Sequence, residues 1–158
     1  MSLHDVRSLQ EAQLVLSQCE CKLSLVKDFG KYGITPLFNA ETGDIAQLFI
    51  DIVKQGEGEQ AAIEYVNTQT AYGDTALMYA VSSDVIRVLV NEGAEVNEPD
   101  TEGKSMLHLA AEALDIEMIH LLMRKGADVN IRDLDNRTPL YYVADPAVRE
   151  LLISFGGL

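Results

Sequence analysis

The sequence predicts an all-α fold in which short pairs of helices repeat along the chain and pack side by side. A phrase of the form Gly-Ala-acidic-Val-Asn occurs at 93–97 and again at 126–130, and the turns that follow end at Gly103 and Asn136, so the phrase and its turn recur with the same spacing. A fixed period of roughly 20 to 50 residues is typical of repeat proteins. The chain has 158 residues, of which 47% are apolar and 23% charged, and this composition suits a short array of small packed repeats.

Each predicted repeat opens with a short first helix. The residue before this helix carries a hydroxyl that can accept a hydrogen bond from an unpaired backbone N–H of the first turn. These residues are Thr35, Thr75, Ser105 and Thr138. In two repeats Pro36 and Pro139 follow at the first helical position, where a missing N–H costs nothing. A leucine stands at the second helical position in all four repeats and begins an apolar face.

A second helix follows in each repeat. In the third repeat Ile116, Ile119 and Leu122 recur at a spacing of three, which places them on one stripe of a helix. Gly93 and Gly126 come directly after two of these helices, and glycine is a common residue for ending a helix. Because one helix pair is too small to bury its apolar face alone, neighbouring pairs must stack.

These segments resemble the ankyrin repeat, whose signature is Thr-Pro-Leu-His-x-Ala at a period of about 33 residues. The third repeat is nearest to that signature, with Leu-His-Leu-Ala-Ala at 107–111. The resemblance covers roughly residues 31–158 and implies an α-solenoid of about four ankyrin-type helix–turn–helix repeats with hairpin-like finger loops. The expected repeats are 31–70, 71–100, 101–133 and 134–158. The resemblance also implies that His108 bonds the backbone between repeats and has no catalytic role.

Residues 1–30 lie outside the clear repeats, and we expect them to form an N-terminal helical cap. Ser2 is a candidate for capping the first helix, and a helical apolar stripe runs from Val15 to Phe29. Because the end of a stack exposes an apolar face that must be covered, a capping role is favoured over a separate partner-binding helix.

The repeats differ in length between the capping hydroxyl and the closing position. The third repeat runs from 105 to 126, whereas the second runs from 75 to 93 and the fourth from 138 to 156, so both are shorter than the third by close to one helical turn. The first helices of the second and fourth repeats are therefore expected to be about one turn shorter.

The first repeat is the longest, because the same interval runs from 35 to 63. Its surplus is assigned to residues 55–60, which form either a solvated loop or a break between two expected helices, 44–54 and 60–65.

Composition argues against nucleic-acid and membrane binding. The chain has 12 Lys and Arg against 25 Asp and Glu, a net charge of −13, and no basic patch stands out that would attract a phosphate backbone. No apolar run approaches the roughly 20 residues that span a bilayer. Residues 1–5 lack the features of a secretory signal, so a cytoplasmic location is expected.

No catalytic, metal or cofactor site is expected. Cys19 and Cys21 lack the further ligands of a structural zinc site and are expected to be reduced thiols. The glycines around Glu57 are not followed by the Gly-Lys-Ser/Thr of a phosphate-binding loop, and 133–136 lacks the later ligands of a calcium loop. No nucleophile has a histidine and an acid in a defensible pattern, so an enzyme is the least favoured alternative.

A partner surface is predicted from the repeat positions. In an ankyrin-like stack the finger tips and the exposed side of each first helix form one concave face. The candidate partner-binding residues are Tyr32, Tyr72, Asp74, Thr101, Glu102, Lys104, Glu112, Leu134, Asp135 and Arg137. Tyr and Arg are residue types that anchor interfaces. The acidic run at 95–102 is either a solubilising surface or an attractor for a basic patch on a partner.

The predicted function is non-catalytic recognition of another protein by a monomer that needs no cofactor. Two subtypes stay open, an adaptor or scaffold and a stoichiometric enzyme inhibitor or immunity-type protein. A host-directed effector is a further use that the fold permits, and an enzyme is the alternative from a different class.

Overall fold

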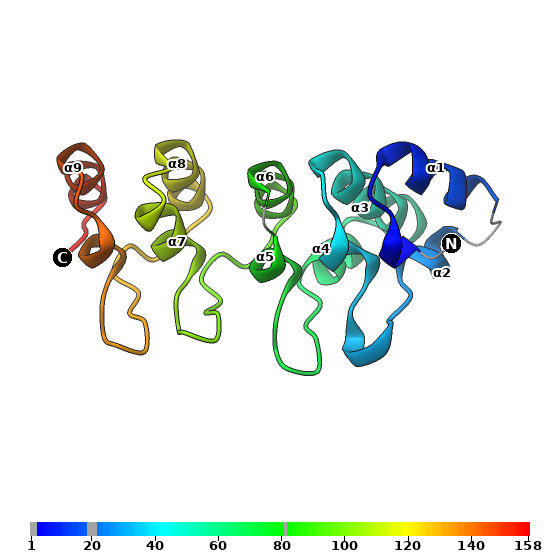
Figure 1. The fold of residues 1–158 in the computed structure, drawn as a ribbon, viewed down its shortest axis with the longest axis horizontal. Helices are drawn as coiled ribbons and strands as arrows, with labels where there is room; N and C mark the ends of the chain where they lie inside the picture. The colour runs from blue at the N-terminus through cyan, green and yellow to red at the C-terminus, as the bar shows by residue number, and fades with distance from the viewer. Residues whose placement is uncertain (1–2, 19–21, 81) are drawn as a thin grey trace. The chain divides into compact units, whose positions relative to one another are not determined.

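The computed structural model describes residues 3–18, 22–80 and 82–158 (Figure 1). Within these residues the regular elements are all helices, and one isolated antiparallel bridge joins Gln69 and Thr75. The chain forms two compact units, an N-terminal unit of residues 1–94 and a C-terminal unit of residues 95–158. The all-α class expected from the sequence is confirmed.

The N-terminal unit is organised around one long helix. In chain order its helices are η1 (Leu3–Asp5), α1 (Leu9–Ser17), α2 (Lys22–Val26), η2 (Lys31–Gly33), η3 (Pro36–Asn39), α3 (Gly43–Glu57), α4 (Glu59–Val66), α5 (Ala76–Tyr79) and α6 (Ser83–Asn91). Helices α1, α2, α4 and α6 all pack against α3. Ile45, Phe49 and Ile50 of α3 are completely buried, so the core of this unit follows one face of α3.

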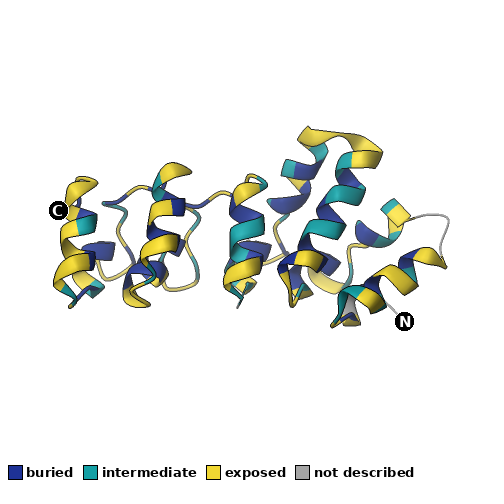
Figure 2. Ribbon diagram, turned by 90° about the horizontal axis from the view of Figure 1, so that it is seen from above, coloured by how far each residue is buried: buried dark blue, intermediate teal, exposed yellow. Residues whose placement is uncertain are grey.

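The C-terminal unit contains two helix pairs. Its helices are α7 (Met106–Glu112), α8 (Ile116–Arg124), η4 (Pro139–Tyr142) and α9 (Pro146–Ser154). Helix α7 packs against both α8 and η4, and Leu107, Ile119 and Leu122 are completely buried. In both units the helices carry a buried face and an exposed face (Figure 2), which is the pattern expected of amphipathic helices in a stack.

The first helices have the unequal lengths that the sequence predicts. Helices α5 and η4 each have four residues, whereas α7 has seven. The difference of three residues is close to one helical turn. Helix η4 ends at Tyr142, and α9 begins shortly after it at Pro146. The Asp145 carboxylate caps α9 by accepting the N–H groups of Ala147 and Val148, and proline suits the first helical position.

Of the two alternatives for residues 55–60, the solvated loop is wrong and the break between two helices is confirmed. Helix α3 continues to Glu57, and α4 begins at Glu59, so Gly58 alone separates them. Gly58 has φ 95° and ψ 177°, a conformation that ends the helix in one residue and that other residues rarely adopt. Gly56 is helical, and Leu23 of α2 packs close to it, since a Cβ at position 56 would lie 2.9 Å from Cδ2 of Leu23.

The hydroxyl residues before the first helices have the extended backbone of an N-cap, but two of them use their side chains in another way. Ser105 Oγ lies 3.1 Å from Nδ1 of His108, and the His108 N–H binds the backbone oxygen of Ser105 instead. Thr138 Oγ1 donates to the backbone oxygen of Leu158 at 3.1 Å. The first turns are tight, so the backbone satisfies itself, and of these two hydroxyls Ser105 contacts its own helix while Thr138 connects to a segment further along the chain.

The asparagine of each Val-Asn pair joins one repeat to the next. Its Nδ2 donates to the oxygen of the glycine that ends the following second helix, and these bonds are Asn67 to Gly93 (2.9 Å), Asn97 to Gly126 (3.1 Å) and Asn130 to Gly156 (2.9 Å). The Oδ1 atoms of Asn97 and Asn130 also accept the N–H groups of Asp128 and Leu158. Groups left unpaired at helix ends are satisfied here by the neighbouring repeat.

The first described segment of the chain belongs to the core of the N-terminal unit. Leu3, Val6 and Val26 are almost completely buried, and the buried Tyr65 hydroxyl donates to the backbone oxygen of Val26 at 3.1 Å. Burial raises the pKa of Tyr65. Helix α1 is capped by Ser8, whose hydroxyl accepts the N–H of Glu11, while the capping candidate Ser2 lies outside the described residues.

Candidate partner-binding surface

The tips of three finger loops are stabilised by the same pattern of hydrogen bonds. A side-chain oxygen three residues after the Val-Asn asparagine accepts the backbone N–H groups two and four residues further on. The accepting atoms are Thr70 Oγ1, Asp100 Oδ1 and Asp133 Oδ1, and the bonds measure 2.8 to 3.2 Å. The turn is therefore fixed by hydrogen bonds from its backbone N–H groups to Thr70, Asp100 or Asp133, and the side chain at its tip has no part in it.

The side chains at these tips project into solvent. Tyr72 is 74% exposed, and the side chains of Glu102 and Asp135 are 68% and 66% exposed. All three are candidates named from the sequence. This hydrogen-bond pattern was not predicted from the sequence. Its signal, an Asp or Thr at a fixed distance from Val-Asn, is nevertheless visible in three repeats.

The N-terminal unit brings its two predicted tyrosines together. The Tyr32 and Tyr72 rings lie 5.7 Å apart with an interplanar angle of 41°, and the N–H of Ala71 donates to the Tyr32 oxygen at 2.8 Å. Tyr32 has φ 69°, a left-handed conformation that is rare for an aromatic residue. Asp74, the third candidate, lies 3.5 Å from the hydroxyl of Tyr79 through its Oδ2 atom.

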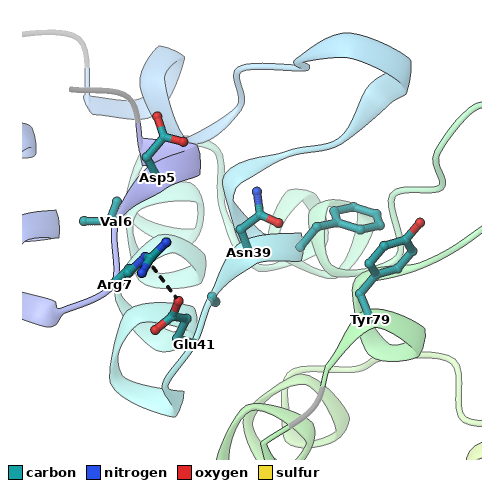
Figure 3. A pocket seen from close by; sticks show the side chains of 8 residues that line it. Asp5, Val6, Arg7, Asn39, Glu41 and Tyr79 are labelled. Carbon is teal, nitrogen blue, oxygen red and sulfur yellow. Dashed lines mark ion pairs between the residues drawn. The ribbon is translucent and has the colours of Figure 1, made fainter.

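A pocket of about 400 Å³ lies beside these residues in the N-terminal unit (Figure 3). Its lining is Asp5, Val6, Arg7, Phe38, Asn39, Ala40, Glu41 and Tyr79. Phe38 and Tyr79 meet edge to face at 5.6 Å, and Arg7 pairs with Glu41 at 3.8 Å. These side chains were not predicted as a site, because the pocket forms where residues 5–7 meet residues 38–41, a contact between segments far apart in sequence.

The C-terminal unit gathers six of the candidates around one pocket of about 370 Å³. These six are Thr101, Glu102, Lys104, Leu134, Asp135 and Arg137. Asp133 and Tyr142 complete the lining. Two neighbouring fingers are joined directly here, because the N–H of Leu134 donates to the Glu102 oxygen at 3.2 Å. Leu134 is 78% exposed and is the aliphatic side chain among the lining residues.

The cations of this pocket are already paired with acids. Lys104 lies 3.2 Å from Glu102 and 3.6 Å from Glu112, and its ammonium stands 4.9 Å from the centre of the Tyr142 ring. The hydrogen bond to Glu102 raises the pKa of Lys104. Arg137 pairs with Asp135 at 3.1 Å. The carboxylates are the more exposed partners, so the accessible charge of the pocket is acidic.

Two buried side chains, Asp133 and His108, hydrogen-bond residues that line the pocket. Asp133 accepts the Tyr142 hydroxyl in addition to two backbone N–H groups. Burial raises the pKa of Asp133, but the hydrogen bonds from Tyr142 and from the N–H groups of Arg137 and Asp135 outweigh it, so the pKa lies below its usual value. His108 is completely buried, with Nδ1 3.1 Å from the Ser105 nitrogen and Nε2 3.1 Å from the Arg137 oxygen. The structural role expected of His108 is confirmed.

The described part of the chain contains neither a candidate metal cluster nor a membrane-spanning helix. Among residues 3–18, 22–80 and 82–158 no cluster of three or more His, Cys, Asp or Glu side chains is placed to hold a metal ion. Cys19 and Cys21, which we expect to be free thiols, lie outside these residues. None of the helices described is long and apolar enough to cross a bilayer.

Comparison with known families identifies the class of protein. A family model described as ankyrin repeats, in three copies, matches residues 7–100 and 82–156. The chain therefore belongs to the ankyrin repeat family, as the resemblance implied. No curated protein matches the sequence. Ankyrin repeats are generally protein–protein interaction modules and are typically not catalytic.

Proposed function

We propose that this protein is a non-catalytic binding module that holds a partner protein carrying a basic patch. The observation that carries the proposal is the pocket of the C-terminal unit, where six candidates meet and where the cations are internally paired while the carboxylates stay exposed. Residues 95–158 carry twelve acidic and six basic side chains, which favours the same kind of partner.

Binding would proceed by exchange of ion pairs around an apolar anchor. Exposed ion pairs such as Arg137 with Asp135 contribute little to stability, so a lysine or arginine of the partner can take over a carboxylate at small cost. Leu134 supplies an apolar contact between the carboxylates of Glu102 and Asp135. Since the finger turns are fixed by hydrogen bonds to Thr70, Asp100 and Asp133, little ordering is needed on binding.

The N-terminal unit offers a surface of the same kind. Tyr32 and Tyr72 form an exposed aromatic pair, and aromatic side chains are frequent interface anchors. Asp74 lies close to Tyr79 and adds a carboxylate. Each unit thus combines an exposed large side chain with acidic neighbours, and we propose that both units contact the partner.

Affinity capture from lysate with matched variants tests this proposal. The surface variant changes Tyr72→Ala, Glu102→Gln and Arg137→Gln. The control variant makes the same kinds of change on outer helix faces, Ile153→Ala, Glu150→Gln and Arg124→Gln. We expect the control to retain the partner that the wild type captures and the surface variant to lose it, with stability changed by about 1 kcal/mol or less in both. Equal capture by both variants contradicts the proposal.

The salt dependence of binding provides the second arm. With the captured partner purified, the association rate is expected to fall as ionic strength rises, because the attraction between the acidic fingers and a basic patch is screened. A rate that does not depend on salt would rule out a basic patch while leaving the finger surface itself in place.

A further inference from the structure

A second pocket of the C-terminal unit has the opposite charge. It has a volume of about 510 Å³ and is lined by three arginines, Arg132, Arg137 and Arg149, together with Tyr141. The chain has only 12 lysines and arginines in all, so three guanidinium groups around one cavity are a local reversal of its acidic character. The proposed partner with a basic patch gives no role to this feature.

Two of the three guanidinium groups have no acidic partner within the described residues. In that part of the chain Arg132 and Arg149 form no ion pair, and each donates from Nη1 to a backbone carbonyl, that of Asn136 at 2.8 Å and that of Leu140 at 3.4 Å. An arginine has five N–H donors in a planar fork, so most donors of both side chains are left for a ligand. Arg137, the third, is paired with Asp135.

The aspartates near this pocket already form hydrogen bonds or an ion pair within the protein. Asp133 is buried and binds Tyr142 and two backbone N–H groups. Asp145 caps helix α9 through the N–H groups of its first turn. Asp135 pairs with Arg137 and is the only aspartate among the lining residues that the structure describes. Among the described lining residues, Asp135 and the carboxylate of Leu158 oppose three guanidinium groups, so the pocket keeps a net positive charge.

Tyr141 gives the pocket an apolar wall. Its side chain is 64% exposed, and the Arg137 guanidinium lies 4.7 Å from the centre of its ring. An aromatic ring beneath a guanidinium group fixes the orientation of that group, and the N–H donors at its edge can still bind an acceptor. An arginine fork matches the geometry of a carboxylate, with which it forms two parallel hydrogen bonds.

We propose that this arginine pocket binds an acidic peptide segment of a protein partner, with neighbouring Asp or Glu carboxylates on Arg132 and Arg149 and the stem of one side chain on Tyr141. The site does not depend on the basic partner proposed above. It gives the C-terminal unit two recognition surfaces of opposite charge, both reaching Arg137, so a partner that alternates basic and acidic segments would engage them together.

Titration of the full chain with a hexaglutamate peptide tests the proposal. Nitrogen–proton NMR spectra are recorded, because the Nε–Hε signals of individual arginines report directly on a bound carboxylate. The Arg132 and Arg149 signals are expected to shift in a saturable way, and a hexaglutamine peptide is expected to have no effect. Shifts that are equal for all arginines, or none at all, overturn the proposal.

A pair of charge-matched variants separates a site from general electrostatics. Arg132→Gln with Arg149→Gln is expected to weaken hexaglutamate binding about tenfold or more, since each lost charge-assisted hydrogen bond is worth about a factor of ten. Lys22→Gln with Arg124→Gln removes the same charge elsewhere and is expected to leave binding unchanged. Equal weakening by both variants overturns the proposal, as does binding of a phosphoserine peptide in the absence of hexaglutamate binding. Arg137 is unchanged throughout, so this test can fail while the finger surface stands.

Discussion

Asn97 Nδ2 donates to the backbone oxygen of Gly126 at 3.1 Å while its Oδ1 accepts the N–H of Asp128 at 2.8 Å. One side chain thus completes the hydrogen bonding of the backbone where helix α8 of the next repeat ends. The same residue type makes the corresponding contact at Asn67 and Asn130, so the connection between repeats is local and repeated.

Asn97→Ala is expected to lower the free energy of unfolding by roughly 1 kcal/mol, because the two bonds are exposed and water replaces them in part. Urea unfolding followed by circular dichroism measures this. Asn97→Asp keeps an acceptor for the Asp128 N–H but loses the donor to Gly126, and is expected to fall between the wild type and the alanine variant. A larger loss of unfolding free energy for Asn97→Asp than for Asn97→Ala would mean that the added charge outweighs the hydrogen bond to the Asp128 N–H.

Leu107→Ala is expected to cost about 2–5 kcal/mol, because Leu107 is completely buried and the cavity left behind cannot be filled by water. Leu109→Ala, in the same helix, is the matched control. Its side chain is 38% exposed, so a cost of about 1 kcal/mol is expected. Similar costs for the two variants in urea unfolding would show that the apolar faces do not lie as described.

Gly103→Ala is expected to be more destabilising than Gly73→Ala. Both glycines have positive φ, 77° and 88°, and an alanine there costs roughly 1–2 kcal/mol in backbone strain. A Cβ on Gly103 would also lie 2.7 Å from the Leu134 nitrogen, whereas a Cβ on Gly73 meets nothing within 4 Å. The difference in unfolding free energy between the two variants therefore measures how tightly neighbouring fingers pack.

Tyr142→Phe is expected to raise the pKa of Asp133 toward its ordinary value, because it removes one of the hydrogen bonds that stabilise the carboxylate. A carboxyl group with a lowered pKa in the folded state stabilises the fold above the unfolded pKa of about 3.9, and this contribution is lost as the pH falls through the folded pKa. The Tyr142→Phe variant should therefore lose the stability contributed by the Asp133 carboxylate at a higher pH than the wild type. Carbon NMR titration of Asp133 measures the pKa, with Tyr141→Phe as control; an unchanged pKa in Tyr142→Phe would contradict the assignment.

Sequence alone specified most of the fold because the fold is periodic. Leu107, His108 and the short first helices α5 and η4 follow from spacing and from the ankyrin resemblance. For residues 55–60 the break between two helices is confirmed and the loop is wrong, because α3 continues through Gly56 to Glu57, which local spacing does not reveal.

The candidate site was predictable only in part. Positions such as Glu102 and Asp135 follow from the repeat, since each repeat presents its tip in the same way. The Phe38 and Tyr79 pair joins two different repeats, and the pocket beside it includes residues 5–7, so it depends on tertiary contacts. The left-handed backbone of Tyr32 is likewise set by its surroundings, because an aromatic residue has no preference for it.

The turn at each finger tip is closed by an oxygen of Thr70, Asp100 or Asp133, and the side chain two places later takes no part in it. Mutation can therefore exchange tyrosine, glutamate or aspartate at that place without endangering the helices beneath. Under the proposed function, single substitutions at 72, 102 and 135 would change what the protein recognises, and a library randomised at these three codons should yield folded variants at high frequency.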